Sequence, residues 1–137
     1  MEIVKPVKEY HKVEHRIYSC QYHVIFCPKY RRKVLVDGIE KDLKSICLAK
    51  QEKYCYKILE IEVMPDHVHL LIDVDPKIGV HLIISRIKGV TSRLLRKKYP
   101  ILVSRLPALW TRSAFISSVG SVTLEVVKKY RESQKGV

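Results

Sequence analysis

The chain has 137 residues, a length that suits one domain, and its hydrophobic and charged fractions of 47% and 29% are typical of a globular protein. No stretch approaches the roughly 18 apolar residues of a membrane helix, and residues 1–6 lack the apolar core of a secretory signal. We therefore expect a single cytoplasmic domain over residues 1–137 that has no membrane partner.

Lysine and arginine outnumber aspartate and glutamate by 26 to 14, which leaves a net charge of +12. Between Asp75 and Glu125 the chain has no acidic residue and nine Lys or Arg. This excess is typical of a protein with a polyanionic partner, and a merely soluble basic surface is the alternative. The cations expected to bind phosphates are Lys29, Arg31, Arg32, Lys33, Arg86, Lys88, Arg93 and Arg96.

Periodicity predicts the first four elements. Residues 1–15 have no pattern and are expected to form an arm. Apolar residues at alternate positions predict a strand over 18–26, and helical spacing predicts a helix over 39–51. Strands follow over 54–64 and 67–74, with a turn at Pro65-Asp66 between them.

The second half continues with a helix over 80–98 that stops at Tyr99-Pro100, a strand over 109–117 and a helix over 124–134. The order is strand, helix, strand, strand, helix, strand, helix. It predicts an α+β fold with a ferredoxin-like split βαβ antiparallel sheet, two helices on one face and an extra C-terminal helix. The other face of the sheet would be free to bind a ligand.

Residues 62–72 contain the strongest candidate for a metal site. On a strand, His67 and His69 project from the same face with their Cα atoms about 6.5–7 Å apart. An even-numbered hairpin would pair Glu62 with His69 and add a carboxylate to the two imidazoles. Such ligands suit Mg²⁺, Mn²⁺ or Zn²⁺ in an open site, with Asp66 as an orienting group.

Two alternatives apply to the histidines of the strands. His67 and His69 also fit a pair of surface histidines with ordinary hydrogen bonds. His23 lies on the first predicted strand and would orient a metal ligand if that strand neighbours His67. For His23 an ordinary hydrogen-bonded histidine is the preferred interpretation.

The terminal helix contains a candidate nucleophile. Tyr130 and Gln134 are four residues apart and share a helical face, while Lys129 and Arg131 flank the tyrosine with positive charge. Neighbouring cations would favour the phenolate, which is the form able to attack phosphorus. The alternative is that the Tyr130 ring only packs against the body of the protein.

Four further segments accompany these motifs, namely Tyr22–Phe26, Pro28–Arg32, Ile87–Arg93 and Leu109-Trp110. In their order and spacing, these segments, the Met64–His69 motif and the pair Tyr130 and Gln134 resemble the single-tyrosine HUH transposases of the insertion sequence 200/605 family. The resemblance covers essentially the whole chain.

The resemblance implies a DNA strand transferase that acts on the single-stranded, hairpin-bearing ends of a mobile element, and that is nucleoid-associated when bound to DNA. By this similarity Tyr130 is the nucleophile and His67 and His69 hold a divalent metal, Mg²⁺ or Mn²⁺. Either Gln134 or Glu62 is the third ligand. The family works as a homodimer, which implies that residues 121–137 are exchanged and that Tyr130 completes the partner's site; assembly within one chain remains the alternative.

In the implied mechanism Tyr130 attacks a scissile phosphate and forms a 5′-phosphotyrosine link, so that joining the strands needs no ATP. Tyr22, Tyr30 and Trp110 are able to stack on bases, but a core role is expected for at least two of them. Two rival functions are a non-catalytic RNA- or DNA-binding module and a metal-dependent phosphodiesterase that attacks with water.

Overall fold

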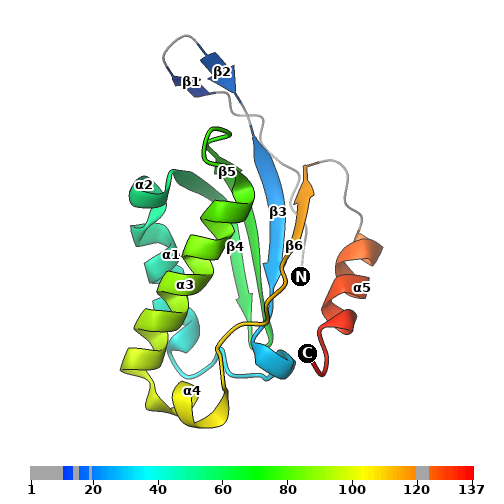
Figure 1. Ribbon diagram of the computed structural model, residues 1–137. Helices are drawn as coiled ribbons and strands as arrows, with labels where there is room; N and C mark the ends of the chain where they lie inside the picture. The colour runs from blue at the N-terminus through cyan, green and yellow to red at the C-terminus, as the bar shows by residue number, and fades with distance from the viewer. Residues whose placement is uncertain (1–10, 14–15, 19, 120–123) are drawn as a thin grey trace.

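The computed structural model describes residues 11–13, 16–18, 20–119 and 124–137, with side chains for 20–119 and 129–137. Its centre is a four-stranded antiparallel sheet in the spatial order β4-β5-β3-β6 (Figure 1). The strands are β3 (Gln21–Phe26), β4 (Tyr56–Met64), β5 (His67–Val74) and β6 (Phe115–Ser118). This is the split βαβ, ferredoxin-like order, and the predicted fold class is confirmed.

The helices lie on both sides of the sheet. The two crossover helices, α1 (Ile39–Ala49) and α3 (Val80–Lys98), cover one face, and α5 (Leu124–Ser133) lies on the other side (Figure 1). The shorter elements are the hairpin of β1 (His11–Val13) and β2 (Arg16–Tyr18), the 3₁₀ turn η1 (Lys29–Arg31), α2 (Gln51–Tyr54) and α4 (Pro100–Arg105). No helix in these described ranges is long and apolar enough to cross a bilayer.

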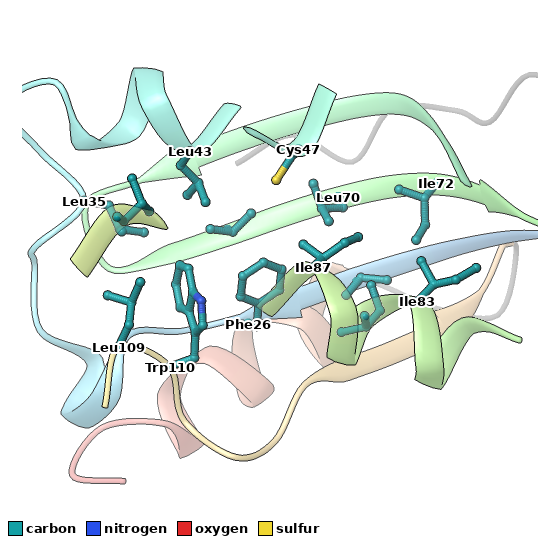
Figure 2. Packing of buried hydrophobic residues seen from close by; sticks show 14 of the residues in the cluster. Phe26, Leu35, Leu43, Cys47, Leu70, Ile72, Ile83, Ile87, Leu109 and Trp110 are labelled. Carbon is teal, nitrogen blue, oxygen red and sulfur yellow. The ribbon is translucent and has the colours of Figure 1, made fainter. Parts of the chain in front are cut away.

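The hydrophobic core lies between the sheet and the two crossover helices (Figure 2). Phe26 is fully buried and meets the Trp110 ring edge-on, with the ring centroids 4.7 Å apart. The Trp110 indole nitrogen donates to Thr91 Oγ1 on α3 at 3.0 Å, so that its polar atom is satisfied inside the core. Trp110 therefore has a structural role.

Alternation along β3 and β5 separates two surfaces. Val24 and Phe26 of β3 point into the core, together with Val68 and Leu70 of β5. The intervening residues therefore face away from α1 and α3. Every residue of β5 is buried, because both of its faces are covered.

Several predicted bounds are confirmed and others are wrong. The strand over 67–74 and the helix over 80–98 have the predicted limits. The predicted strand over 109–117 is only Phe115–Ser118, because Leu109 and Trp110 are core residues of an irregular segment. Part of the predicted arm forms β1, which pairs with β2, while residues 1–10, 14–15 and 121–123 lie outside the described residues.

Candidate active site

The turn between β4 and β5 sets the register of the candidate metal ligands. Met64 pairs with His67 and Glu62 pairs with His69, so the predicted cross-strand pairing of Glu62 is confirmed. His67 and His69 lie on the face of β5 that points away from the core. Both rings are nevertheless buried, with 3% and 1% of their surface exposed.

Asp66 holds the His67 ring. Its Oδ1 lies 2.8 Å from His67 Nδ1. Burial raises the pKa of Asp66, but the hydrogen bonds from His67 and Arg31 and the positive charge of Arg31 outweigh it and hold this pKa below its usual range. Because an ionised carboxylate only accepts, His67 Nδ1 carries the proton and Nε2 carries a lone pair. That Nε2 is buried and has no hydrogen-bond partner within the described part of the chain, as a metal ligand would be before it binds.

The second ring, His69, contacts His23 of the neighbouring strand. His23 Nδ1 lies 3.2 Å from His69 Nε2, and the remaining His69 nitrogen, Nδ1, is buried without a partner. Burial, followed by the effect of His23, lowers the pKa of His69 to about 4. His69 is therefore neutral near pH 7, which is the state that a metal ligand requires.

The donor set fits a divalent cation in part. Two neutral imidazoles with buried, unpartnered nitrogens lie on one face, and Glu62 stands opposite His69 in register. Within the described residues, however, no three His, Cys, Asp or Glu side chains gather closely enough to hold a metal ion. The His pair would therefore need further ligands, such as substrate oxygens or water.

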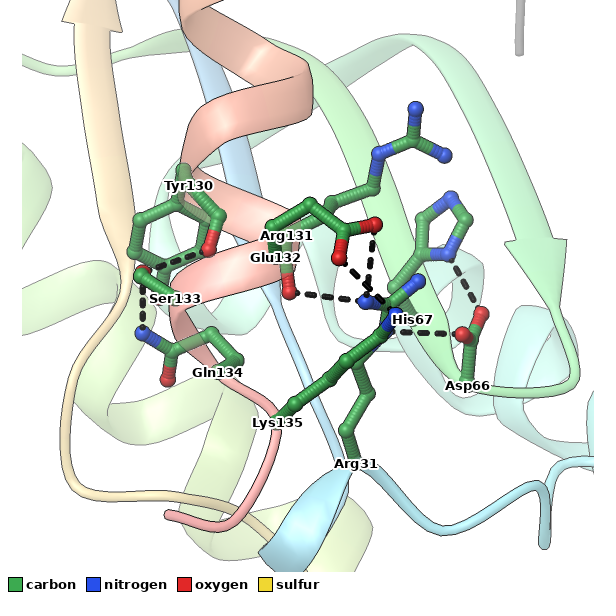
Figure 3. A network of polar contacts seen from close by, with 9 residues as sticks. All are labelled: Arg31, Asp66, His67, Tyr130, Arg131, Glu132, Ser133, Gln134 and Lys135. Atoms are coloured by element: carbon green, nitrogen blue, oxygen red, sulfur yellow. Dashed lines mark hydrogen bonds and ion pairs between the residues drawn. The ribbon is translucent and has the colours of Figure 1, made fainter.

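Arg31 joins this turn to the terminal helix, a contact that the sequence did not reveal. Its Nε donates to Asp66 Oδ2 at 2.8 Å, and one terminal nitrogen donates to the Arg131 carbonyl at 3.0 Å and lies 3.5 Å from a Glu132 carboxylate oxygen (Figure 3). Tyr30 and Arg31 have φ values of 59° and 51°, which for residues other than glycine costs roughly 1–2 kcal/mol each. This unusual backbone directs the Arg31 side chain between the two elements.

Tyr130 lies away from the His pair. Its hydroxyl is 3.3 Å from Ser113 Oγ, and its ring packs on Phe115 with centroids 5.3 Å apart. Phe115 pairs with Ile25, and Ile25 pairs with His69. Two strand spacings, roughly 10 Å, therefore separate Phe115 from His69 across the sheet.

The expectation that neighbouring cations favour the Tyr130 phenolate is wrong for this arrangement. Burial raises the pKa of Tyr130 above its usual value, and the hydrogen bond from Ser113 offsets only part of this effect. Lys129 and Arg131 flank Tyr130 in the sequence, but the main causes of its pKa shift are burial, Ser113, Cys27 and the Phe115 backbone. Tyr130 is therefore held as a neutral phenol in this position.

Gln134 also lies apart from the histidines. Its Oε1 accepts from Thr111 Oγ1 at 3.2 Å and from Ser113 Oγ at 3.0 Å, and its Nε2 donates to Ser133 Oγ at 3.2 Å. The predicted shared face of Tyr130 and Gln134 is confirmed, because both side chains meet Ser113. The structure does not bring the Gln134 amide to His67 or His69.

The side chain that α5 presents to the His pair is that of Arg131. Figure 3 shows it extending from the helix toward His67, and its positive charge lowers the pKa values of His67 and His69 after the larger effect of burial. Its Nε is buried without a hydrogen-bond partner. The sequence suggested Arg131 only as a neighbour of the phenol.

The predicted phosphate-binding cations fall on different parts of the molecule. Lys29, Arg31, Arg32 and Lys33 follow β3 beside the His turn, where Leu35 N donates to Pro65 O at 3.1 Å. Arg86 and Arg93 are exposed on α3, which covers the opposite face of the sheet.

Lys88 and Arg96 also lie on α3, where both hold backbone carbonyl groups. Lys88 bonds to the Thr111 and Ser113 carbonyls, and Arg96 bonds to the Leu106 and Pro107 carbonyls. Among the aromatic candidates for base stacking, Tyr30 is 44% exposed, whereas Tyr22 packs half-buried against the core.

Comparisons with known proteins agree with this arrangement. The family model "Transposase IS200 like" matches residues 16–134. The ISDra2 transposase TnpA of Deinococcus radiodurans is 36% identical over 120 residues, which cover 86% of each chain. The transposase for insertion sequence element IS200 of Salmonella typhimurium is 31% identical over 114 residues, 82% of this chain and 75% of that protein.

Two solved structures share the fold. The crystal structure of a Deinococcus radiodurans protein assigned as a transposase superposes with a TM-score of 0.84 at 30% identity, over 93% of this chain and 99% of that chain. A REP-associated tyrosine transposase bound to a REP hairpin gives a TM-score of 0.54 at 13% identity, over 96% of this chain and 68% of that chain, which supports the fold alone. From the sheet, the extra terminal helix and these matches together, the chain belongs to the IS200-like transposase family.

Proposed function

We propose that this transposase cleaves and rejoins single-stranded DNA through a covalent bond to Tyr130, with Mg²⁺ or Mn²⁺ held by His67 and His69. The observation that carries the proposal is the pair of buried imidazole nitrogens without partners, on the face of the sheet where the tyrosine-bearing helix docks. When bound, the metal would offset the negative charge on the oxygens of the scissile phosphate.

The reaction balances without an external energy source. The Tyr130 oxygen attacks phosphorus, a new phosphorus–oxygen bond forms, and the bond to the 3′-oxygen breaks. The phenol gives up its proton, and the released 3′-oxygen takes one up to become a hydroxyl. The 5′-phosphotyrosine keeps the energy of the phosphodiester, so another 3′-hydroxyl can reverse the step and join two ends.

The residues around the His pair would prepare the site for this step. Asp66 fixes the His67 ring with Nε2 available, and Arg31 holds Asp66 in turn. Glu62 is in register to act as a third ligand, whereas Gln134 would first have to leave Thr111 and Ser113. Exposed cations beside the turn, such as Arg32 and Lys33, would bind the flanking phosphates.

The position of Tyr130 favours a shared site. In this chain the phenol packs on Phe115, about two strand spacings from His69. We infer a homodimer in which α5 is exchanged, so that Tyr130 of one subunit reaches the metal site of its partner. The REP-associated tyrosine transposase that shares this fold is bound to a REP hairpin, and we propose hairpin-bearing DNA as the substrate of this chain as well.

Replacing the nucleophile tests the proposal. Tyr130→Phe should abolish the protein–DNA adduct that forms with labelled single-stranded DNA from the ends of the element in the presence of Mg²⁺ or Mn²⁺, because the attacking oxygen is gone. DNA binding should stay within about 1 kcal/mol, since only one hydroxyl is removed. The measurement is a denaturing gel for the adduct together with a binding titration.

Tyr54→Phe is the matched control, because Tyr54 lies on α2 and contacts Lys53 and Arg86 rather than the His face. This variant should form the adduct at the wild-type rate. Cleavage by Tyr130→Phe at an undiminished rate would instead indicate attack by water, and binding without any cleavage by the wild type would indicate a binding module.

A further inference from the structure

The contact between His23 and His69 has the geometry of an in-plane hydrogen bond. The two rings are nearly parallel, at 9°, and their centroids are 5.5 Å apart, while the nitrogens are 3.2 Å apart. The centroid separation is close to the nitrogen separation plus the two ring radii, so the rings meet edge to edge. If the lone pairs of His23 Nδ1 and His69 Nε2 both pointed at one shared cation, they would lie at an angle to the line between these two nitrogens. The observed geometry therefore indicates a hydrogen bond between the rings.

One proton must lie between His23 Nδ1 and His69 Nε2, and it can be bonded to either nitrogen. If His23 donates from Nδ1, neutral His69 must carry its own proton on Nδ1. Within the described residues that nitrogen is buried without a partner, so its N–H would be left without a hydrogen bond, at a cost of roughly 1–3 kcal/mol. The proton would also occupy the position that a metal needs. If His69 donates from Nε2, its Nδ1 has a lone pair that a metal can use.

We propose that His23 is a positioning residue whose Nδ1 accepts a hydrogen bond from the Nε2–H of His69, and thereby reserves the Nδ1 lone pair of His69 for the divalent metal. The two ligands are then prepared in opposite ways. Asp66 accepts a hydrogen bond from His67 Nδ1–H and leaves the Nε2 lone pair free. His23 accepts a hydrogen bond from His69 Nε2–H and leaves the Nδ1 lone pair free. The inference rests on the proposed metal-dependent function and goes beyond it, because it assigns the proton at each nitrogen.

The burial of His23 supports this role. The ring is 2% exposed on β3, and the strand pairing fixes its position, because Ile25 pairs with His69 and His23 pairs with Leu71. His23 and His69 therefore lie diagonally on the same face of adjacent strands. This position directs His23 Nδ1 to His69 Nε2, 3.2 Å away.

The first test reads the proton directly on the wild-type protein without DNA. ¹⁵N NMR should find His69 in the Nε2–H form and His67 in the Nδ1–H form. Addition of Mg²⁺ or Zn²⁺ should shift His69 Nδ1 while Nε2 keeps its proton. A His69 ring in the Nδ1–H form, or a metal-induced shift at Nε2 in place of Nδ1, would overturn the inference.

The second test uses a matched pair of variants and Mn²⁺ binding measured by calorimetry. His23→Leu removes the acceptor and should weaken Mn²⁺ binding by about 10- to 100-fold, as is typical when the partner of a metal ligand is lost. His23→Asn keeps an acceptor oxygen near the Nδ1 position and should recover most of the affinity. Equal Mn²⁺ affinity in the two variants would contradict the role of His23.

The outcomes separate this inference from the proposed function. If the wild type binds no Mn²⁺, the metal-dependent function itself fails. If the wild type and both variants bind Mn²⁺ equally and Tyr130 still forms the DNA adduct, only the role of His23 fails. Circular dichroism of both variants checks that the fold is intact, and the NMR experiment needs no variant at all.

Discussion

Ser113 is a single residue that holds both functional side chains of the terminal helix. Its hydroxyl lies 3.3 Å from the Tyr130 hydroxyl and 3.0 Å from Gln134 Oε1. The hydroxyl has one proton, which it can donate either to the phenol oxygen or to Gln134 Oε1. The segment before β6 therefore sets the position of the Tyr130 side chain.

We expect Ser113→Ala to raise the pKa of Tyr130 further, because the hydrogen bond from Ser113 lowers this pKa in the wild type. The free energy of unfolding should fall by about 1 kcal/mol, the usual effect of losing one net hydrogen bond. The measurement is the pH titration of the Tyr130 ¹³Cζ resonance. Ser104→Ala on α4 is the control and should leave the titration unchanged; an unchanged Tyr130 pKa in Ser113→Ala would contradict the prediction.

For single residues, the sequence predicts which side chains share a face better than it predicts which groups each side chain contacts. Alternation along a strand is enough to place His67 and His69 on one face and Glu62 opposite His69, and helical spacing places Tyr130 with Gln134. The partners of the phenol come from an irregular segment without any period. No pattern in the sequence could therefore indicate Ser113 or its effect.

Among the elements, the contact between the His turn and α5 depends on Arg31. The ion pair with Asp66 is 12% and 16% exposed at its two side chains, so solvent screens it little. The same guanidinium holds the Arg131 carbonyl near the end of the helix. Together with the contacts of Tyr130 and Gln134, this guanidinium attaches the terminal helix to the sheet.

Arg31→Gln should lower the free energy of unfolding by about 2 kcal/mol, because hydrogen bonds to a charged group are lost from a mostly buried site. Amide hydrogen exchange in α5 should become faster at the same time. Denaturant unfolding and exchange mass spectrometry measure the two effects. Arg32→Gln removes the same charge from an exposed neighbour and should stay within about 0.5 kcal/mol; equal effects of the two variants would show that Arg31 is only a surface cation.

The predicted elements differ in accuracy for physical reasons. The helix over 80–98 has a continuous apolar stripe and ends before a proline, so both of its limits were predictable. Pro100 ends the predicted helix and also begins α4, because proline suits the first turn of a helix. Leu109 and Trp110 resemble a strand by composition, but tertiary packing places them in an irregular core segment.

In the whole molecule, packing and chemistry occupy opposite faces of one sheet. The core fills the face beneath α1 and α3, while His23, His67 and His69 lie on the other. The exposed cations of α3, such as Arg86 and Arg93, lie beyond the core from the histidines. DNA that contacts both regions must therefore extend around the protein, and a short strand at the His pair would meet only the cations beside the turn.

Mixing two inactive subunits tests whether the sites are shared. Co-expression of Tyr130→Phe and His67→Ala chains should recover about a quarter of wild-type adduct formation, because half of the dimers are mixed and each has one intact site. The adduct should lie on the His67→Ala chain, which a size tag distinguishes on the gel. Each variant expressed alone is the control. No recovery above these controls would place the whole site within one chain.

Consecutive residues of a helix point about 100° apart. In the position that α5 has here, the Arg131 side chain points toward His67, and the Tyr130 side chain points away from it and packs on Phe115. In this position the helix brings the Arg131 guanidinium, and not the Tyr130 phenol, to the histidines. The positive charge of Arg131 would repel a divalent cation that binds there. If a divalent cation binds there as proposed, its binding and the undocking of the terminal helix are therefore thermodynamically coupled, each favouring the other.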